Sequence, residues 1–203
     1  MSRRRGNLYI ITGPSGTGKG SICKEILKDE ENEFSISMTT REARKGEAHG
    51  EDYYFVSEEE FLKNIEAGNF LEHAEVYDHR YGTPKDMVMK QLERGHNVIL
   101  DIDTQGGLNV KKMMPESVLI FILPPSLAEL RKRLEGRGTD SREVMEKRLS
   151  KAADEIKLIG EYDYYVVNDD IDEAVNQVKS IITAEKCRVP DKIKDIIKNY
   201  EHE

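Results

Sequence analysis

Short, continuous runs of apolar residues are the clearest feature of the hydrophobic pattern along the chain. Four of them are flanked by turn residues, at positions 8–11, 98–100, 118–123 and 164–167. Continuous rather than alternating apolar runs indicate strands buried on both faces, and a helix-like stretch follows each run. Strands that alternate with helices predict an α/β fold with a parallel sheet at its core.

The same pattern predicts the helices, one of which begins with a clear start signal. The expected ranges are 19–30, 58–66, 84–94, 126–135, 141–159, 171–186 and 190–200. Thr83 and Pro84 supply a cap residue and a proline at the first position of the helix over 84–94. Asp140 and Ser141 form a cap pair before the helix over 141–159.

Two segments interrupt the alternation of strands and helices. Residues 34–83, rich in Thr, Tyr, Gly and charge, indicate short strands and one helix, and residues 136–142 form a basic loop with two glycines. We therefore expect one domain over residues 1–203, with an inserted subdomain and a mobile lid on one core. The expected boundaries are 1–36, 86–125 and 160–203 for the core, 37–85 for the subdomain and 126–159 for the lid.

The charge balance is acidic, with 31 Lys and Arg against 39 Asp and Glu and a formal net charge of −8. An acidic surface repels phosphate backbones, so nucleic acid is not expected as a partner. No apolar run approaches the ~20 residues of a membrane span, and no signal-peptide pattern is present. Two cysteines and five scattered histidines favour neither a disulfide framework nor a metal cluster. We expect a cytoplasmic protein that does not bind membranes; its oligomeric state stays open.

A glycine-rich motif directly follows the first predicted strand and leads into the first predicted helix. It is Gly13-Pro14-Ser15-Gly16-Thr17-Gly18-Lys19. The glycines let successive backbone N–H groups point at a phosphate, and Lys19 supplies a charge for the β- and γ-phosphates. The alternative is an ordinary glycine-rich turn, which the strand before and the helix after disfavour. We predict an ATP site that extends through Gly20 and Ser21.

The residue after the lysine departs from the usual form of this motif. A Ser or Thr there commonly ligates Mg²⁺, whereas here Gly20 is followed by a hydroxyl one residue later, at Ser21. Two arrangements stay open: Ser21 reaches the metal from a shifted turn, or phosphates and water hold the ion. Either arrangement makes Mg²⁺, bound with ATP, the expected cofactor.

Residues 37–55 are the most informative part of the predicted subdomain. Arg41 and Arg44 lie three residues apart, and Tyr53 follows a turn that contains glycine. Two planar guanidinium groups and a phenol suit a terminal phosphate, which Arg binds through two parallel hydrogen bonds. Taken alone, the segment is equally compatible with a solvated charged loop.

At this point the chain resembles the guanylate kinase family. The family pattern T-T-R-x-x-R-x-G-E-x-x-G-x-D-Y-x-F is complete over residues 39–55. Further family motifs follow in order: Phe70-Leu71-Glu72-His73-Ala74, Tyr81-Gly82-Thr83, Leu100-Asp101-Ile102-Asp103, Pro124-Pro125-Ser126, Leu134-Glu135-Gly136-Arg137-Gly138-Thr139 and Val167-Asn168-Asp169-Asp170. The resemblance implies a P-loop nucleoside monophosphate kinase fold, in which residues 37–85 bind GMP.

The resemblance also implies roles for individual residues of the acceptor site. The GMP phosphate would be held by Arg41, Arg44, Tyr53 and Tyr81, and the guanine side would be formed by Ser37, Glu72, Thr83 and Asp103. The chemistry agrees, because one carboxylate can accept hydrogen bonds from both N1–H and N2–H₂ of guanine. Adenine offers no such pair, so it would leave a buried carboxylate unpaired.

On the ATP side, the resemblance implies that arginines of the lid neutralise the transferring phosphate. Arg133, Arg137 and Arg148 match these arginines, and Asn168 resembles a residue beside the adenine. The predicted catalytic set is Lys19, Arg41, Asp101, Arg137 and Arg148. Asp101 and Asp103 alternate at the end of a predicted strand, so we expect both on one face, near Mg²⁺ and nucleotide.

The implied activity is phosphate transfer from ATP to GMP, giving ADP and GDP, with dGMP as a further acceptor to test. One rival is another nucleoside monophosphate kinase, which would lack Glu72 in this setting. The other is a non-catalytic guanylate-kinase-like protein-interaction module, whose phosphate loop is usually degenerate. Arg80, in a segment that departs from the family pattern, is expected to face solvent.

Overall fold

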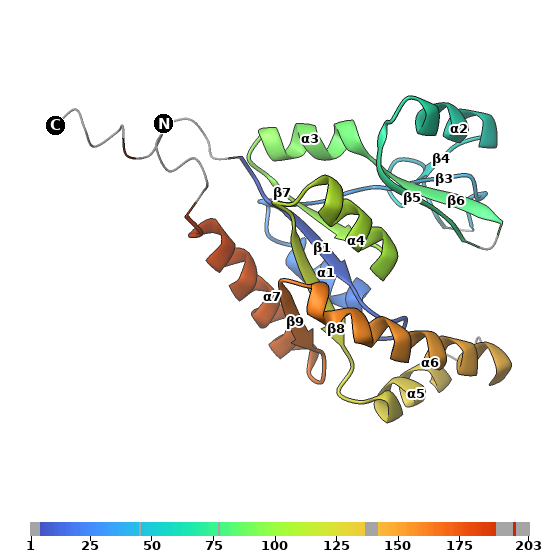
Figure 1. Ribbon diagram of the computed structural model, residues 1–203, viewed down its shortest axis with the longest axis vertical. Coiled ribbons are helices and arrows are strands. Elements are labelled where there is room, and N and C mark those ends of the chain that lie inside the picture. The colour runs from blue at the N-terminus through green and yellow to red at the C-terminus, as the bar shows by residue number, and fades with distance from the viewer. Residues whose placement is uncertain (1–4, 45, 77, 137–141, 190–196, 198–203) are drawn as a thin grey trace.

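The computed structural model describes residues 5–44, 46–76, 78–136, 142–189 and 197 (Figure 1). Its core is a five-stranded parallel sheet in the order β2-β7-β1-β8-β9. The strands are β1 (Leu8–Thr12), β2 (Asn32–Phe34), β7 (Asn97–Asp101), β8 (Val118–Leu123) and β9 (Tyr164–Val167). The four strands predicted from apolar runs are present to within one residue at each end, and the predicted α/β class is confirmed.

Helices cover both faces of this sheet and bury alternate side chains of its strands. On one face, Tyr9 and Ile11 pack with apolar residues of α1 (Lys19–Ile26) and α7 (Ile171–Lys186). On the other, Leu8 and Ile10 pack with α3 (Lys85–Glu93) and α4 (Thr104–Met113). Figure 1 shows α1 and α4 on opposite sides of the strands. The apolar runs of β1, β7 and β8 are therefore continuous because both faces of these strands are buried, whereas the edge strand β9 exposes Tyr165 and Val167.

A second, four-stranded sheet lies beside the core, in the order β4-β3-β6-β5. Its strands are β3 (Met38–Thr39), β4 (Tyr54–Phe55), β5 (Phe70–Val76) and β6 (His79–Pro84), and α2 (Glu58–Glu66) packs on it. Phe61 of α2 stacks on Phe70 of β5, with ring centroids 4.6 Å apart. Short strands and one helix were expected in this segment, and both are present.

The two helices after β8 form a hairpin with an apolar contact of its own. α5 (Leu127–Glu135) and α6 (Arg142–Ile156) pack through Leu130, Leu134 and Leu149, and a short 3₁₀ helix, η1 (Lys157–Glu161), continues from α6. Figure 1 places this hairpin and the second sheet on the same side of the core. The predicted caps Asp140 and Ser141, and the helix predicted at 190–200 apart from residue 197, lie outside the described residues.

Two elements were not predicted, and one predicted helix start is wrong. β2 escaped notice because Asn32–Phe34 carries two polar residues, and α4 because two adjacent glycines weaken helix propensity. Gly107 is nevertheless needed, since a Cβ there would lie 2.8 Å from Thr12 Cγ2 of β1. Pro84 is the last residue of β6, not the first of a helix, so α3 begins at Lys85 without a side-chain cap.

None of the helices in the described part of the chain is long and apolar enough to cross a membrane.

Candidate functional site

The glycine-rich motif forms the loop between β1 and α1. Gly18 is the N-cap of α1 and has φ +90°, a left-handed conformation that favours glycine. The buried amide of Asn168 donates to the Thr17 carbonyl at 2.7 Å, and a Cβ at Gly18 would lie 2.3 Å from that nitrogen. The conformation and the lack of space therefore both require glycine at this position.

This loop borders a cavity of about 650 Å³. The cavity is lined by Gly13, Ser15, Gly16, Gly18, Lys19, Gly20, Ser21, Asp101, Ile102, Asp103, Arg148, Lys151 and Glu155. The Lys19 ammonium donates to the carbonyls of Gly13 (2.7 Å) and Pro14 (3.2 Å), so the lysine folds over the loop. The N-terminal end of α1 and a cation thus face one cavity, an arrangement that suits phosphate.

Two aspartates reach this cavity from the end of β7, though not in the predicted way. β7 ends at Asp101, whose pKa is raised by burial, an effect that Lys19 partly offsets. Asp103 lies beyond the strand and caps α4, where its carboxylate accepts from the Gly106 N–H at 2.8 Å. The prediction that both lie on one face of a strand is therefore wrong, but both carboxylates still border the cavity.

The α5–α6 hairpin contributes one face of α6 to the same cavity. Arg148 donates to the Ser15 hydroxyl at 3.1 Å, as expected for a residue near the phosphates. Lys151 and Glu155 were not predicted, although the spacing of 148, 151 and 155 places them on one helix face. Burial raises the pKa of Glu155, and the positive charge of Lys151 opposes that rise. The Thr104 hydroxyl lies 3.5 Å from the Glu155 carboxylate.

The other predicted ATP-side residues differ in what they contact. Arg133 donates to the Asn168 carbonyl at 2.8 Å and pairs with Glu129, so in this arrangement it ties α5 to the end of β9. Asn168 is buried against the loop through Thr17. Arg137 lies outside the described residues.

Of the two cysteines, Cys23 is buried in α1, and this burial raises the pKa of its thiol well above the usual range. Cys187 is exposed.

On the second sheet, the structure brings three of the predicted phosphate-binding side chains together. Tyr53 and Tyr81 meet edge to face, with centroids 5.9 Å apart, and the Arg41 guanidinium lies 5.4 Å from the Tyr53 ring centroid. Both terminal nitrogens of Arg41 lie 2.9 Å from the Glu47 carboxylate. Hydrogen bonding to Glu47 raises the Arg41 pKa. Glu47 was not singled out from the sequence.

Glu47 also organises the turn that carries the second arginine. Glu47 Oε2, which also contacts Arg41, accepts from the Arg44 backbone N–H at 2.8 Å, while the Arg44 side chain is exposed. Ser37 lies just before β3, and its carbonyl accepts from the Tyr54 N–H at 2.9 Å. Arg80, which was expected to face solvent, is partly exposed and forms surface ion pairs with Glu58 and Glu75.

The predicted guanine side centres on Glu72 of β5. The Thr83 hydroxyl of β6 donates to Glu72 Oε1 at 2.8 Å. Burial raises the Glu72 pKa, and Asp103 raises it further, while the bond from Thr83 lowers it. Gly106 of α4 lies close by, since a Cβ there would be 3.1 Å from Glu72 Oε2 and 3.5 Å from Asp103 Oδ1. The start of α4 thus links Glu72 to the phosphate cavity.

Three features occur together in this structure: a parallel sheet with a glycine-rich loop after its first strand, a second sheet that carries an arginine–tyrosine cluster, and a helical hairpin beside the loop. Together they define the fold of a P-loop nucleoside monophosphate kinase. A family model described as "Guanylate kinase" matches residues 5–185. The chain belongs to the guanylate kinase family.

Individual relatives agree with this assignment. A guanylate kinase of Caldanaerobacter subterraneus subsp. tengcongensis is 53% identical over 96% of this chain and 94% of its own. One of Clostridioides difficile is 46% identical over the full length of both chains. The crystal structure of guanylate kinase from Anaplasma phagocytophilum matches with a TM-score of 0.74 and 37% identity, over 93% of this chain and 90% of that one.

Proposed function

We propose that this protein transfers the γ-phosphate of ATP to GMP, giving ADP and GDP. The observation that carries the proposal is the Glu72 carboxylate, held by Thr83 and joined through the start of α4 to the phosphate cavity. Relatives named guanylate kinase, at 46–53% identity over nearly the whole chain, support it. Nothing in the structure favours the protein-interaction module, since the loop keeps both Gly18 and Lys19.

The ATP phosphates would occupy the cavity of the glycine-rich loop. Backbone N–H groups of the loop and of the first residues of α1 would point at them, apart from Pro14, which has none, and Thr17 and Ser21, whose N–H groups donate to Pro14 and Gly18. Lys19 would exchange its two carbonyl acceptors for phosphate oxygens. Arg148 is already at the loop through Ser15, and Arg133 and Arg137 would add charge from the hairpin. We keep Asn168 as a residue beside the adenine.

The GMP phosphate would lie among Arg41, Arg44, Tyr53 and Tyr81. Arg41 is held by Glu47, so a phosphate must share or replace this carboxylate to bind it. A dianion is the stronger partner, because two guanidinium groups can then contact three oxygens. Ser37, Thr83 and Asp103 would complete the guanine side around Glu72. This division gives residues 37–85 the acceptor role and residues 126–159 the role of a lid.

Mg²⁺ would accompany ATP in the phosphate cavity. The oxygen ligands that the ion prefers are available there from the Ser21 hydroxyl and the Asp101 carboxylate, both of which line the cavity. When bound, the ion supplies charge neutralisation to the phosphates. Because a hydroxyl follows Gly20 rather than Lys19 directly, we assign most of its coordination to phosphates and water.

Catalysis would rest on positioning and charge, without a covalent intermediate. The two substrates must meet in line between the loop and the second sheet, with Lys19, Arg41, Arg137 and Arg148 offsetting the charge of the transferring group. Asp101 would hold the metal and Lys19 in place. Closure of the hairpin and second sheet would exclude water and so limit hydrolysis of ATP. We place this reaction in the cytoplasm, as part of purine nucleotide metabolism.

A coupled assay of ADP release tests the proposal, with GMP, dGMP, AMP, CMP and UMP as acceptors. GMP is expected to be the best acceptor, because only guanine supplies two donors to Glu72. Higher activity with AMP would contradict the guanine assignment. Absence of turnover with every acceptor would favour the interaction module instead.

A further inference from the structure

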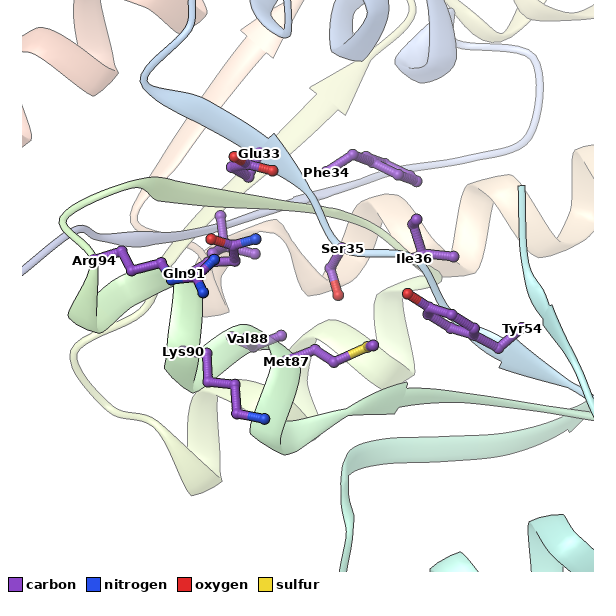
Figure 2. A pocket seen from close by; sticks show the side chains of 11 residues that line it. Glu33, Phe34, Ser35, Ile36, Tyr54, Met87, Val88, Lys90, Gln91 and Arg94 are labelled. Carbon is purple, nitrogen blue, oxygen red and sulfur yellow. The ribbon is translucent and has the colours of Figure 1, made fainter. Parts of the chain in front are cut away.

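A second cavity lies apart from the phosphate cavity and shares no lining residue with it. It has a volume of about 250 Å³ and lies between β2, the segment 35–37 that leads to the second sheet, and α3 (Figure 2). Phe34, Ile36 and Val88 give it an apolar lining, and Met87 closes one side. Its size suits a ligand smaller than a nucleotide.

The Ser35 hydroxyl is the feature of this cavity that calls for a ligand. Ser35 is only 8% exposed, and its Oγ has no hydrogen-bond partner among the described residues. Its backbone is fixed, because its N–H donates to the Ile99 carbonyl at 3.0 Å. Figure 2 shows the hydroxyl directed into the cavity, toward α3. A buried hydroxyl without a partner destabilises the protein, and a ligand polar atom in the cavity would remove that penalty.

The charges at the rim indicate the sign of the ligand. Lys90 of α3 and Arg94, the C-cap of this helix, are both exposed, and neither forms an ion pair with another described residue. The lining also contains one carboxylate, Glu33, whose oxygen lies 3.6 Å from His96 Nδ1, so the two cations at the rim outnumber one acidic group. On a protein of net charge −8, two unpaired cations beside an apolar cavity form a local site for an anion.

We propose that this cavity binds a small aromatic carboxylate. The ring would lie against Phe34 and Met87, which are 40% and 43% exposed in the structure, and its carboxylate would pair with Lys90 and Arg94. A hydrogen-bond donor on the ring would reach the Ser35 hydroxyl. The ring, the carboxylate and the hydrogen-bond donor of the ligand thus each have a partner group in the cavity.

The position of the cavity gives the bound ligand a second effect. The cavity borders one of the two chain connections between the sheets, residues 34–38, and its α3 wall starts directly after the other, at Pro84. Tyr54 of the second sheet also lines it, and the Tyr54 N–H donates to the Ser37 carbonyl. A ligand here contacts the core and the second sheet together and restricts their relative movement. Because the second sheet is proposed to close when GMP binds, this restriction is expected to raise KM for GMP, and the expectation rests on the proposed GMP subsite.

The absence of tryptophan from the chain allows a direct binding test with indole-3-acetate. Its indole emission, excited beyond the tyrosine absorption, reports binding to the complete protein without a protein background. Saturable binding is expected, about tenfold weaker for the neutral analogue indole-3-acetamide, because the amide cannot pair with two cations. Absence of saturable binding, or equal affinity for the two probes, would overturn the proposal.

Three variants locate the bound probe. The double variant Lys90→Glu, Arg94→Glu is expected to weaken binding of indole-3-acetate by about tenfold or more, and the matched variant Lys85→Glu, at the start of the same helix, is not. Ser35→Ala is expected to weaken binding by about two- to tenfold and to raise the unfolding midpoint of the empty protein. Binding that is insensitive to these cavity changes would place the probe elsewhere.

Kinetics with and without indole-3-acetate test the second effect. KM for GMP is expected to rise in the wild type and to stay constant in the Lys90→Glu, Arg94→Glu variant, whose activity without the probe is unchanged. If the probe binds and is lost in this variant while KM for GMP stays constant, the site stands and the coupling is wrong. If the wild type without the probe does not phosphorylate GMP, the proposed function is wrong, whereas the measured binding of the probe is unaffected.

Discussion

At the scale of single residues, Glu72 combines a functional role with a local conflict. Its carboxylate is buried, which raises its pKa, and the charged form is supported mainly by one hydroxyl, that of Thr83. A ligand that supplies further hydrogen-bond donors stabilises the charged form of such a carboxylate, and guanine supplies two donors on adjacent atoms. On the proposed function, we expect selectivity for guanine to come from this carboxylate, for which Thr83 is the one side-chain donor among the described residues.

Replacing Glu72 by Gln tests this selectivity. The amide keeps the oxygen that accepts from Thr83 but turns the second acceptor into a donor that faces guanine. The ratio of kcat/KM for GMP to that for AMP is expected to fall by about 100-fold or more, while KM for ATP changes little. Steady-state kinetics with both acceptors measure the ratio, and an unchanged ratio would remove Glu72 from the base site.

The raised pKa of Glu72 also predicts how GMP use depends on pH. Protonation removes an acceptor, so kcat/KM for GMP falls as pH decreases through this pKa, at a higher pH than for an ordinary carboxyl. The GMP phosphate itself titrates near pH ~6. Subtracting the profile of Glu72→Gln, which keeps the contributions of the phosphate and of the other carboxyl groups, isolates the Glu72 carboxylate. Parallel profiles for wild type and variant would contradict this prediction.

The same pKa shift has a consequence for stability. Because the folded pKa lies above the unfolded value, the folded state binds more protons, and stability decreases as pH rises through this range. Glu72→Gln is therefore expected to raise the unfolding midpoint at neutral pH, with the gain disappearing in acid. Thermal unfolding at a series of pH values measures it. A gain that is equal at all pH values would mean that the carboxylate charge is not its source.

At the scale of elements, α4 shows where sequence patterns were insufficient. Its glycines weaken helix propensity, yet they let the helix approach β1 and Glu72 closely. This benefit is visible only after Thr12 and Glu72 are brought next to it by the fold. By contrast, the core strands and most helices followed from local patterns, because burial on two faces and helical periodicity leave a direct record in the sequence.

Gly107→Ala is expected to destabilise the protein by roughly 1–3 kcal/mol, because the new methyl group would meet Thr12 at 2.8 Å. Gly160→Ala is the matched control, because a Cβ there would meet no atom from other parts of the structure within 4 Å. Denaturant unfolding of both variants measures the difference. Equal stability would show that α4 can shift away from β1 without loss.

The same contrast applies to the site. The glycine-rich loop could be placed between β1 and α1 from its motif and the flanking patterns, while Arg41 and Glu72 were singled out through the resemblance to the family, and their roles stay predictions. Glu47, Lys151 and Glu155 were missed because charged residues on a loop or an exposed helix are usually solvated. Their partners, Arg41 and the phosphate cavity, come from other segments of the chain.

At the scale of the whole molecule, the protein has a net charge of −8, although both proposed substrates, ATP and GMP, are anions. The cations proposed to bind the nucleotides lie at the loop, at Arg41 and Arg44, and on the hairpin, while the net negative charge of the protein repels nucleotides at long range. Screening this repulsion is expected to increase the association rate of a fluorescent ATP analogue as salt is added. Stopped-flow measurements test this, and a steep decrease with salt would instead indicate electrostatic attraction over the whole surface.

The contact between Lys19 and the carbonyls of Gly13 and Pro14 sets a threshold for occupancy of the loop. An incoming anion must replace two existing hydrogen bonds before it gains the ammonium group. A small anion such as chloride or inorganic phosphate offers little in return, whereas a nucleoside triphosphate brings three phosphate groups and a base. We therefore expect a nucleoside triphosphate to displace these two bonds of Lys19 at a lower concentration than a simple anion does.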